Sequence, residues 1–367
     1  MGNINKMNVA FAAIDTYVQD NIVENNQKEI KGKDIIEYGD KNIYPNYLYD
    51  LYENVSVVKS IVNGISGCFS NITINLPDYQ KQINENGDTV EDVVKQIIID
   101  FSIYGGFALN IVRNRLGGIA GVYNLDFKNI RSNKNNTTFY YSADWANKSL
   151  GRIKNTSYPA FDPDDKTQLT SIYYYKDEKY KTYPSPRWGG SVKSAEVLKH
   201  IAEFHLNSLY NGLSSDYIVN MNAGIPSDDI KEEIEDNFNE RFTGWQNGGR
   251  AMLSWNSDFA HRTTVEEIPQ NSFIDRYNAL EKSAKQDIYC AFNISPAILG
   301  LPSEHLGFSD EDLIESWRIA TELLFRPILK VVKRAFEKIF SQKEVVSIEI
   351  VNIDFNKSGN NTEEIVK

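Results

Sequence analysis

The chain has 367 residues, of which 41% are apolar and 24% are charged, and its formal net charge is −11. This length allows one large domain or two to three ordinary ones, and the apolar content excludes a chain that is disordered throughout. The acidic balance argues against a general nucleic-acid binder with a basic surface, but it suits a protein that lets a polyanion pass without holding it.

No segment has the length and apolar content of a membrane span, and the first 21 residues lack the basic-then-apolar pattern of a signal segment. We therefore expect a protein of the cytosol, or of a particle that is assembled there. Two cysteines, Cys68 and Cys290, lie in apolar helical patterns and are expected to be buried, reduced thiols.

The first part of the chain predicts an arm, a helix and a strand. Residues 1–30 are polar and rich in Asn and Glu, which predicts a loosely held arm. A turn-rich segment with Pro45 follows, and apolar residues at helical spacing then predict a helix over 50–67 that ends at glycines. The β-branched residues of 72–76 predict a short strand.

A second helix has a clear start signal. Thr89 is followed three residues later by Asp92, a pattern typical of a helix N-cap, and the apolar spacing predicts a helix over 90–104. Two adjacent glycines end it. Strand-like segments at 107–114 and 118–126, joined by a glycine-rich turn, predict a β-hairpin.

The stretch 128–190 predicts strands and loops that are rich in Tyr and Thr. The tyrosines of 139–183 have two interpretations: they form cross-strand pairs of a sheet, or they offer stacking surfaces to a glycan. The segment PSPRWGG at 184–190 predicts a hinge-like linker.

The rest of the chain is mainly helical. We expect helices over 191–213 and 271–292, with two strands and an acidic helix capped by Ser227 between them. A wide apolar stripe at 197–209 suggests burial on two sides, in a core or between subunits, and His205 is expected to be a packing residue. A final helix over 309–341 would be about 50 Å long, and Pro327 should kink it.

No motif for catalysis is present. The sequence lacks a phosphate-binding P-loop, the H-E-x-x-H pattern and a G-x-S-x-G elbow, and its four histidines have no metal-ligand spacing. We therefore expect a protein that is not an enzyme and has no cofactor.

Charge is unevenly distributed. Acids concentrate in 228–240 and 304–315, and no Lys or Arg occurs from Asp287 to Glu315. Bases concentrate on the last helix, at Arg326, Lys330, Lys333, Arg334 and Lys338. One interpretation is ordinary compensation of the helix dipole. The other is a pore, whose wall should repel DNA or be neutral because each contact between a cation and a phosphate would add friction.

The order of these segments resembles that of portal proteins of tailed bacteriophages, of the group that includes lambdoid and siphovirus portals. The similar phrases are YGDKNIYPNYLYDLYENVSVVKSIVNGIS, SAEVLKHIAEFHLNSLYNG, YIVNMNAGIPSDDIKEEIEDNFNERFTGWQNGGRAMLSW, SFIDRYNALEKSAKQDIYCAFNISPAILGL and EHLGFSDEDLIESW. Their order, rather than any single phrase, carries the resemblance, which is most specific over 190–342.

The resemblance implies an α+β, portal-like fold with an α/β wing, long stem helices, a small α/β clip and a long kinked tunnel helix, assembled as a ring. The implied segments are an N-terminal arm at 1–30, a wing at 31–190, a first stem helix at 191–213, a clip at 214–268, a second stem helix at 269–293, a tunnel loop at 294–309, a tunnel helix at 310–342, and a short C-terminal strand with a tail at 343–367. A large helical crown is expected to be absent or minimal.

The resemblance also implies a function. The ring, twelve-fold in virions, would occupy one capsid vertex, and double-stranded DNA would pass through it during packaging and ejection. Its partners would be further copies of itself, the large terminase subunit, the head-tail adaptor, and the major capsid and scaffold proteins. The protein would belong to the virion, and to the host cytoplasm during assembly. The alternative is a non-enzymatic glycan-binding module that uses the Tyr-rich region.

Three groups of residues are candidates for this function. Those expected to face or border the channel are Glu304, His305, Asp310 and Glu311. Those expected on the clip, where partners would bind, are Asp228, Asp229, Glu232, Glu233 and Asp236. Pro327 is the expected site of the helix bend.

Overall fold

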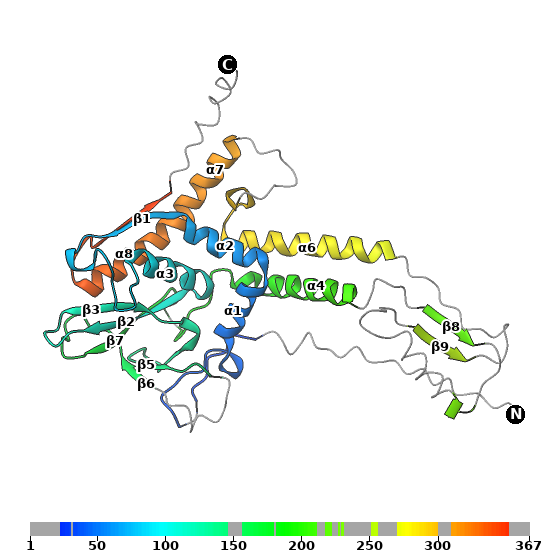
Figure 1. The fold of residues 1–367 in the computed structure, drawn as a ribbon, viewed down its shortest axis with the longest axis horizontal. Coiled ribbons are helices and arrows are strands. Elements are labelled where there is room, and N and C mark those ends of the chain that lie inside the picture. Colours follow the sequence, from blue (N-terminus) through cyan, green and yellow to red (C-terminus); the bar gives the residue numbers. More distant parts are fainter. Residues whose placement is uncertain are drawn as a thin grey trace, which may run out of the picture. The chain divides into compact units, whose positions relative to one another are not determined.

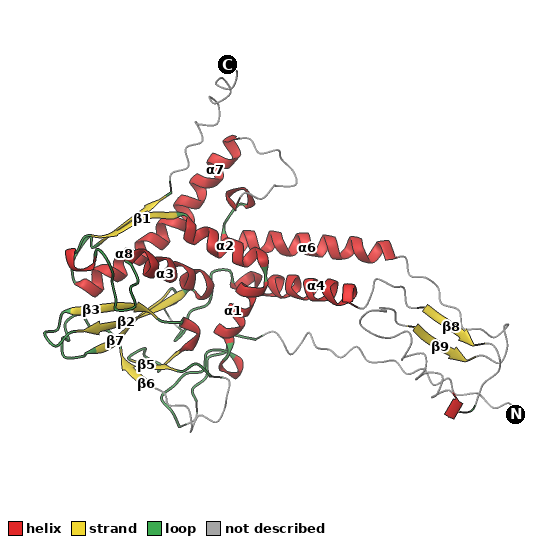
Figure 2. Cartoon of the chain, in the orientation of Figure 1, coloured by secondary structure: helices red, strands yellow, loops and turns green. Residues whose placement is uncertain are grey.

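A computed structural model gives the fold of the chain (Figure 1, Figure 2). The residues that the structure describes are 23–30, 32–145, 156–179, 181–210, 217–221, 227, 229–230, 251–255, 270–299 and 310–351. The chain divides into two compact units. Unit 1 comprises Met1–Glu53, Lys59–Gly189 and Asn293–Lys367, and unit 2 comprises Asn54–Val58 and Gly190–Phe292.

Two helices replace the single helix predicted over 50–67. Helix α1 spans Tyr44–Asn54, and helix α2 spans Ser56–Gly67, with one residue between them. The helical part begins earlier than predicted because Pro45 occupies the first turn of α1, where its missing N–H group leaves no helical hydrogen bond unmade. The predicted end at Gly67 is confirmed.

Helix α3, Val90–Tyr104, has the predicted bounds. The Thr89 hydroxyl accepts a hydrogen bond from the Asp92 amide at 3.2 Å, and the Thr89 amide donates to the Asp92 carboxylate at 2.9 Å. This capping box satisfies two amide groups that a helix start leaves free. Gly105 ends the helix with a φ of 77°, a left-handed conformation that favours glycine.

A three-stranded antiparallel sheet lies beside α3. Strands β2, Gly106–Arg113, and β3, Ile119–Asn124, form the predicted hairpin, and β7, Thr170–Lys176, pairs with the other edge of β2. The sheet order is therefore β3-β2-β7. Helix α3 contacts β2 and β3, so the apolar side chains of the central strand and of α3 form one core.

Unit 1 has two further sheets. Strands β4, Ile130–Ser132, β5, Thr138–Tyr141, and β6, Thr156–Pro159, form a second antiparallel sheet. Strand β1, Phe69–Ile74, begins three residues before its predicted start and pairs antiparallel with β10, Val346–Ile350, near the end of the chain. Short 3₁₀ turns occupy Asp40–Asn42, Pro77–Tyr79, Phe127–Asn129, Gly189–Ser191 and Pro296–Leu299.

The predicted C-terminal helix is a run of three helical segments. Helix α7, Asp310–Ala320, leads into a π-helical turn, Thr321–Phe325, and then into helix α8, Arg326–Phe340. Pro327 lies in the first turn of α8, directly after the π-helical turn. A proline ring crowds the carbonyl four residues earlier, so this wider turn occurs where Pro327 disturbs the regular helix. The bend itself remains a prediction.

Helix α8 completes the core of unit 1. One face of the helix is buried, through Ile328, Val332, Ala335, Phe336 and Ile339. This face contacts α3 and β10, so segments far apart in the sequence share one core (Figure 1).

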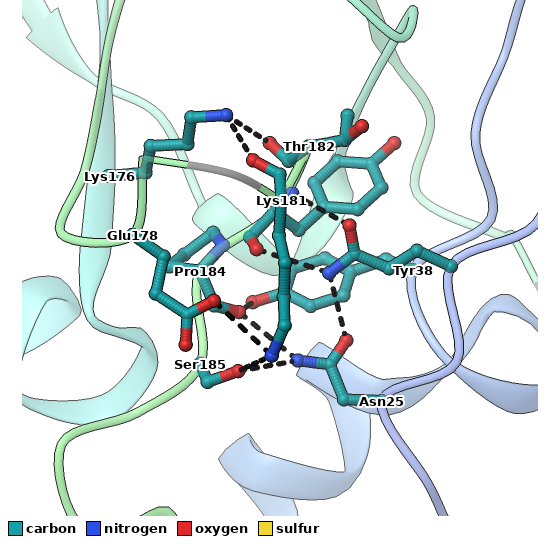
Figure 3. Close-up of polar contacts among 10 residues, drawn as sticks. Asn25, Tyr38, Lys176, Glu178, Lys181, Thr182, Pro184 and Ser185 are labelled. Atoms are coloured by element: carbon teal, nitrogen blue, oxygen red, sulfur yellow. Dashed lines mark hydrogen bonds and ion pairs between the residues drawn. The ribbon is translucent and has the colours of Figure 1, made fainter.

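The segment predicted as a hinge-like linker, 184–190, is bound at its start by other residues of unit 1 (Figure 3). The Tyr38 hydroxyl donates to the carbonyl of Pro184 at 2.7 Å, and the Asn25 side-chain amide donates to the Ser185 hydroxyl at 3.0 Å. Lys176 donates to the carbonyl of Thr182 at 3.4 Å from the neighbouring strand β7. The start of the segment is therefore fixed within unit 1, whereas the division between the two units falls at its last residues, Gly189 and Gly190, and a hinge there stays a prediction.

Two buried aromatic side chains also hold this part of the chain. Tyr183 and Trp188 are almost completely buried, and the ring of Tyr183 stacks on that of Tyr38 at 4.3 Å. A Cβ atom on Gly105 would lie 2.5 Å from the carbonyl oxygen of Ser185, so the glycine that ends α3 also permits the close approach of this segment.

In the described part of unit 2, two long helices and two strands are the main elements. Helices α4, Val192–Tyr210, and α6, Gln270–Phe292, contact each other and agree with the predicted helices within three residues at each end. Strands β8, Tyr217–Met221, and β9, Ala251–Trp255, form a parallel pair. Parallel strands need a crossover connection. Most of that connection, including most of the predicted acidic helix, lies outside the described residues.

Candidate functional site: exposed helix surfaces

The residues predicted for a channel are only partly described. Asp310 and Glu311 are the first two residues of α7, where acids suit the positive end of the helix dipole. Glu304 and His305 lie outside the described residues. The next acids of α7, Asp312 and Glu315, are exposed.

One of the five acids predicted for the clip can be located. Asp229 is exposed and helical, and the amide of Ile230 donates to the carbonyl of Ser227 at 3.1 Å, so a helical turn begins at the predicted cap. The other four acids, Asp228, Glu232, Glu233 and Asp236, lie outside the described residues.

Helix α7 and the π-helical turn that follows it expose large apolar side chains that the sequence analysis did not single out. Ile314, Ile319 and Leu323 are 42%, 48% and 64% exposed. Ile319 and Leu323 are one helical turn apart, so they share a face, and the exposed Asp312 and Glu315 lie near that face. Several exposed aliphatic side chains on one short helix are typical of a surface that a partner covers.

Helix α8 is different because its exposed side is basic. Arg326, Lys330, Arg334 and Lys338 recur at every fourth position and are all exposed. Residues with this spacing form one ridge along a helix. Charge is therefore segregated along a single helical run, with acids on α7 and bases on α8.

In unit 2, the apolar stripe of α4 is only half covered. Leu198 and Ile201 are buried, whereas Phe204 and Leu206 are 48% and 51% exposed. Phe204 stacks on Tyr277 of α6 at 5.1 Å, and this contact leaves about half of the Phe204 side chain open. The expectation that the stripe is covered on two sides is therefore met within unit 2 only for the first half of the helix.

Two expectations about individual residues are wrong. His205 was expected to pack, but it is exposed, and its nearest aromatic neighbours are Phe204 and Tyr277. Cys290, on α6, is exposed, whereas Cys68 is buried as expected and burial raises the pKa of its thiol to about 11. Both residues lie in apolar helical patterns, and such a pattern does not show how far the neighbouring elements cover each position.

Several tyrosines of the strand region pack against other aromatic rings of unit 1. Tyr174 stacks on Phe127 at 5.7 Å, and Tyr175 stacks on Phe107 at 5.3 Å. Tyr173 is buried, and burial raises its pKa to about 12. These rings are used inside the sheet and its core, so the interpretation as cross-strand packing is favoured and the glycan-binding alternative is not supported.

A polar cluster at the end of α3 contains an acid in an unfavourable environment. The Asn124 side-chain amide donates to the Asp100 carboxylate at 2.9 Å, and Asp126 pairs with Lys128 at 3.0 Å. Burial raises the pKa of Asp100 to about 8, and the hydrogen bond from Asn124 only partly opposes this. The folded state therefore binds a proton at Asp100 more tightly than the unfolded chain does.

This cluster predicts a pH dependence of stability. Because the pKa of Asp100 is higher in the folded state, its contribution to the free energy of unfolding falls as the pH rises from about 4 to about 8. We expect Asp100→Asn to be more stable than the wild type at pH 9 by about 1–2 kcal/mol, and to differ little at pH 4. Urea denaturation at both pH values measures this. An equal shift at both would contradict it, and exposed Asp78→Asn is the control.

Unit 1 also has a surface hollow. A hollow of about 490 Å³ in unit 1 is lined by Ile72, Thr73, Ile74, Asn75, Gln80, Thr89, Val90 and Glu91. Its one charged side chain, Glu91, forms an ion pair with Lys95 at 2.6 Å. Among the described residues, no group of three or more His, Cys, Asp or Glu side chains could hold a metal ion. Within that same part of the chain, no helix has the length and apolar character that crossing a membrane requires.

Comparisons with known proteins give structural relatives only. No protein-family model matches the sequence, and no curated protein matches it. A chain in the neck of an empty gene transfer agent (GTA) particle is similar, with 13% identity and a TM-score of 0.54 over 86% of this chain and 85% of that chain. A chain of the native GTA virion has 14% identity and a TM-score of 0.52, with 86% of both chains covered.

A third similar structure is an HK97 family phage portal protein from Corynebacterium diphtheriae, with 12% identity and a TM-score of 0.49 over 83% of this chain and 94% of that chain. At such low identities the GTA neck and virion chains establish a shared fold, one that extends over most of both chains. The likeness to these two chains concerns the fold alone.

Proposed function

We propose that this chain is a portal protein, a non-enzymatic subunit of a ring at one vertex of a phage or phage-like capsid. The observation that carries the proposal is the fold, which is similar over 86% of the chain to a chain in the neck of a GTA particle. The neck of the native particle is described with twelve-fold symmetry, and that of the empty particle with six-fold symmetry. A ring of several copies, twelve by analogy, is the assembly that this symmetry suggests.

The exposed surfaces support a protein that works as an assembly. Large apolar side chains are exposed on α4, α6, α7 and the π-helical turn after α7, through Phe204, Leu206, Leu280, Ile319 and Leu323. Several such side chains on long helices fit contacts with further copies or with capsid and scaffold proteins. Residues 31–190 would form the wing, and α4 and α6 would form the two stem helices.

The acidic balance supports a conduit for double-stranded DNA. A chain with a net charge of −11 presents few sites at which phosphates would be retained, so DNA can move through the ring during packaging and ejection. The loop that holds Glu304 and His305, together with Asp310 and Glu311, would border the channel. The clip acids Asp228, Asp229, Glu232, Glu233 and Asp236 would meet the large terminase subunit and then the head-tail adaptor. The protein would lie at the portal vertex of the virion, after assembly in the host cytoplasm.

The proposal predicts annular particles. Purified protein, examined by negative-stain electron microscopy and native mass spectrometry, should form rings with a central opening, and the mass should give a single copy number, with twelve expected. If the chain alone is monomeric, co-expression with the capsid and scaffold proteins of the same genome should incorporate it at one vertex. A chain that stays monomeric and is absent from particles in both experiments would contradict the proposal.

A further inference from the structure

Two of the four cations in the basic ridge of α8 form no ion pair with the residues that the structure describes. Among the described residues, no ion pair reaches Lys330 or Arg334, whereas Arg326 pairs with Glu322 at 3.2 Å. Lys338 lies over the ring of Tyr173, at 5.7 Å from its centre. Residues 326–340 contain five Lys or Arg and one Glu, in a chain whose net charge is −11. This is a local excess of positive charge that the composition of the chain does not lead one to expect.

The helix dipole explains only the end of this ridge. Cations stabilise a helix within its last turn, and the effect declines rapidly beyond that turn. Lys338 is the one base in the last turn of α8, whereas Lys330 and Arg334 lie one to two turns earlier. These two exposed, unpaired cations therefore need another explanation.

A complementary surface exists on α7 together with the π-helical turn that follows it. Its exposed Ile319 and Leu323 share a face near the exposed acids Asp312 and Glu315. The one ion pair of Glu315, to Arg318 at 3.2 Å, is solvent-exposed, and such pairs contribute little. The long aliphatic stems of Lys and Arg can cover exposed Ile and Leu side chains while their charged ends reach acids.

The two surfaces cannot meet within one copy. Glu315 and Arg334 are separated by 19 positions of a helical run, which corresponds to about 28 Å along its axis. We propose that α7 of one copy packs against α8 of a second copy, with the basic ridge of the second copy covering the acidic and apolar face of the first. This contact uses two different surfaces of each copy, which is the kind of contact that closes into a ring.

The inference rests on the proposed function and adds to it the surfaces that join neighbouring copies. The test uses charge reversal in the full-length chain. The basic variant carries Lys330→Glu and Arg334→Glu, the acidic variant carries Asp312→Lys and Glu315→Lys, and a third variant carries all four changes. Ring formation is measured by mass photometry over a range of protein and salt concentrations, and in particles formed with capsid and scaffold proteins.

We expect the basic variant and the acidic variant each to need about tenfold more protein for half-maximal assembly, because two attractive contacts become repulsive. The variant with all four changes should recover most of the lost assembly, because the reversed charges again face opposite charges. High salt should weaken assembly of the wild type. The inference would be overturned if the basic or the acidic variant assembled like the wild type. It would also be overturned if the variant with all four changes assembled less well than both of them.

A matched apolar pair of variants provides a control. Leu323→Ser should weaken ring formation about as much as one charge pair, whereas Leu116→Ser should have no effect, because Leu116 is 93% exposed in the turn of the β2-β3 hairpin. Thermal unfolding of both variants should match the wild type, which separates loss of contact from loss of folding. Loss of assembly by Leu116→Ser as well would overturn the assignment of the surface.

Three other results have separate meanings. If the basic variant assembles normally but binds duplex DNA more weakly than the wild type, the occupant of the ridge is DNA and the inference fails. If the wild type forms rings that all these variants leave unchanged, the inference fails while the proposed function stands. If the wild type forms no ring and enters no particle, the proposed function itself fails.

Discussion

Replacing Arg131 by methionine should lower the free energy of unfolding of unit 1 by about 3–5 kcal/mol, because several buried acceptors would lose their donor at once. Arg131 has no exposed surface. Its guanidinium donates to the carbonyls of Lys128 at 2.8 Å, Ile130 at 2.7 Å and Asn42 at 2.5 Å.

Aromatic rings complete the environment of this cation. The guanidinium carbon lies 5.1 Å from the centre of the Trp145 ring and 5.7 Å from that of the Tyr38 ring. Burial lowers the pKa of Arg131 to about 10, so the group stays charged at neutral pH. The charge is balanced by carbonyl dipoles and ring faces, and these groups remain behind when the side chain is removed.

A lysine at this position should recover only part of the lost stability. Lys keeps the charge, but it lacks the planar fork that reaches three carbonyls at fixed angles. Urea denaturation followed by tryptophan fluorescence measures the effect, since Trp145 lies beside the guanidinium. Arg115→Met, in the exposed turn of the β2-β3 hairpin, is the control and should change stability by less than about 0.5 kcal/mol. A loss below about 1 kcal/mol for Arg131→Met would show that the buried acceptors find other donors.

Arg131 also shows what the sequence could not predict. The bounds of α3 follow from Thr89, Asp92 and Gly105, three local signals that act within a few residues. The burial of Arg131 depends on Asn42 and Trp145, which lie on either side of it in the sequence and come together only in the folded chain. A lone arginine between strand residues carries no mark of this role.

Longer-range pairing explains the other differences. Strand β1 extends to Phe69 because β10, at the end of the chain, provides the partner strand. The first residues of the linker predicted at 184–190 are held because Asn25 and Tyr38, far upstream, bind Ser185 and Pro184. Proline and glycine content alone could not reveal these contacts.

For the candidate site, residue type was predictable but exposure was not. The acids of α7 and the bases of α8 are visible in the sequence. The spacing of Ile319 and Leu323 shows that they share a face, but an exposed and a buried face look alike until the neighbouring elements are known. Ala320 and Leu324 are buried, and Ile319 and Leu323 lie one position earlier on a different face of the helix. Large apolar residues on two faces of one helix were the sequence signal that could have found them.

The second large effect is expected at Trp188. This side chain has no exposed surface, and its indole N–H donates to the carbonyl of Ile103 at 3.1 Å. Trp188→Ala should lower the free energy of unfolding by about 3–5 kcal/mol, as expected when a buried tryptophan is removed from a packed core. Trp188→Phe should cost less, because it keeps much of the packing and loses mainly the hydrogen bond.

Proteolysis gives a local measure of the same change. Arg187 precedes Trp188, pairs with Asp177 at 2.8 Å and lies over the ring of Phe101 at 4.8 Å, so trypsin should cut there only when the segment opens. Since 1.4 kcal/mol corresponds to a factor of ten in an equilibrium, a loss of about 3 kcal/mol should speed cleavage after Arg187 about a hundredfold. Trp317→Ala, at a half-buried position of α7, should leave this cleavage slow. Equal cleavage of the wild type and Trp188→Ala would mean that the segment opens without Trp188 leaving its site. The hydrogen bonds of Asn25 and Tyr38, rather than the Trp188 side chain, would then hold the segment.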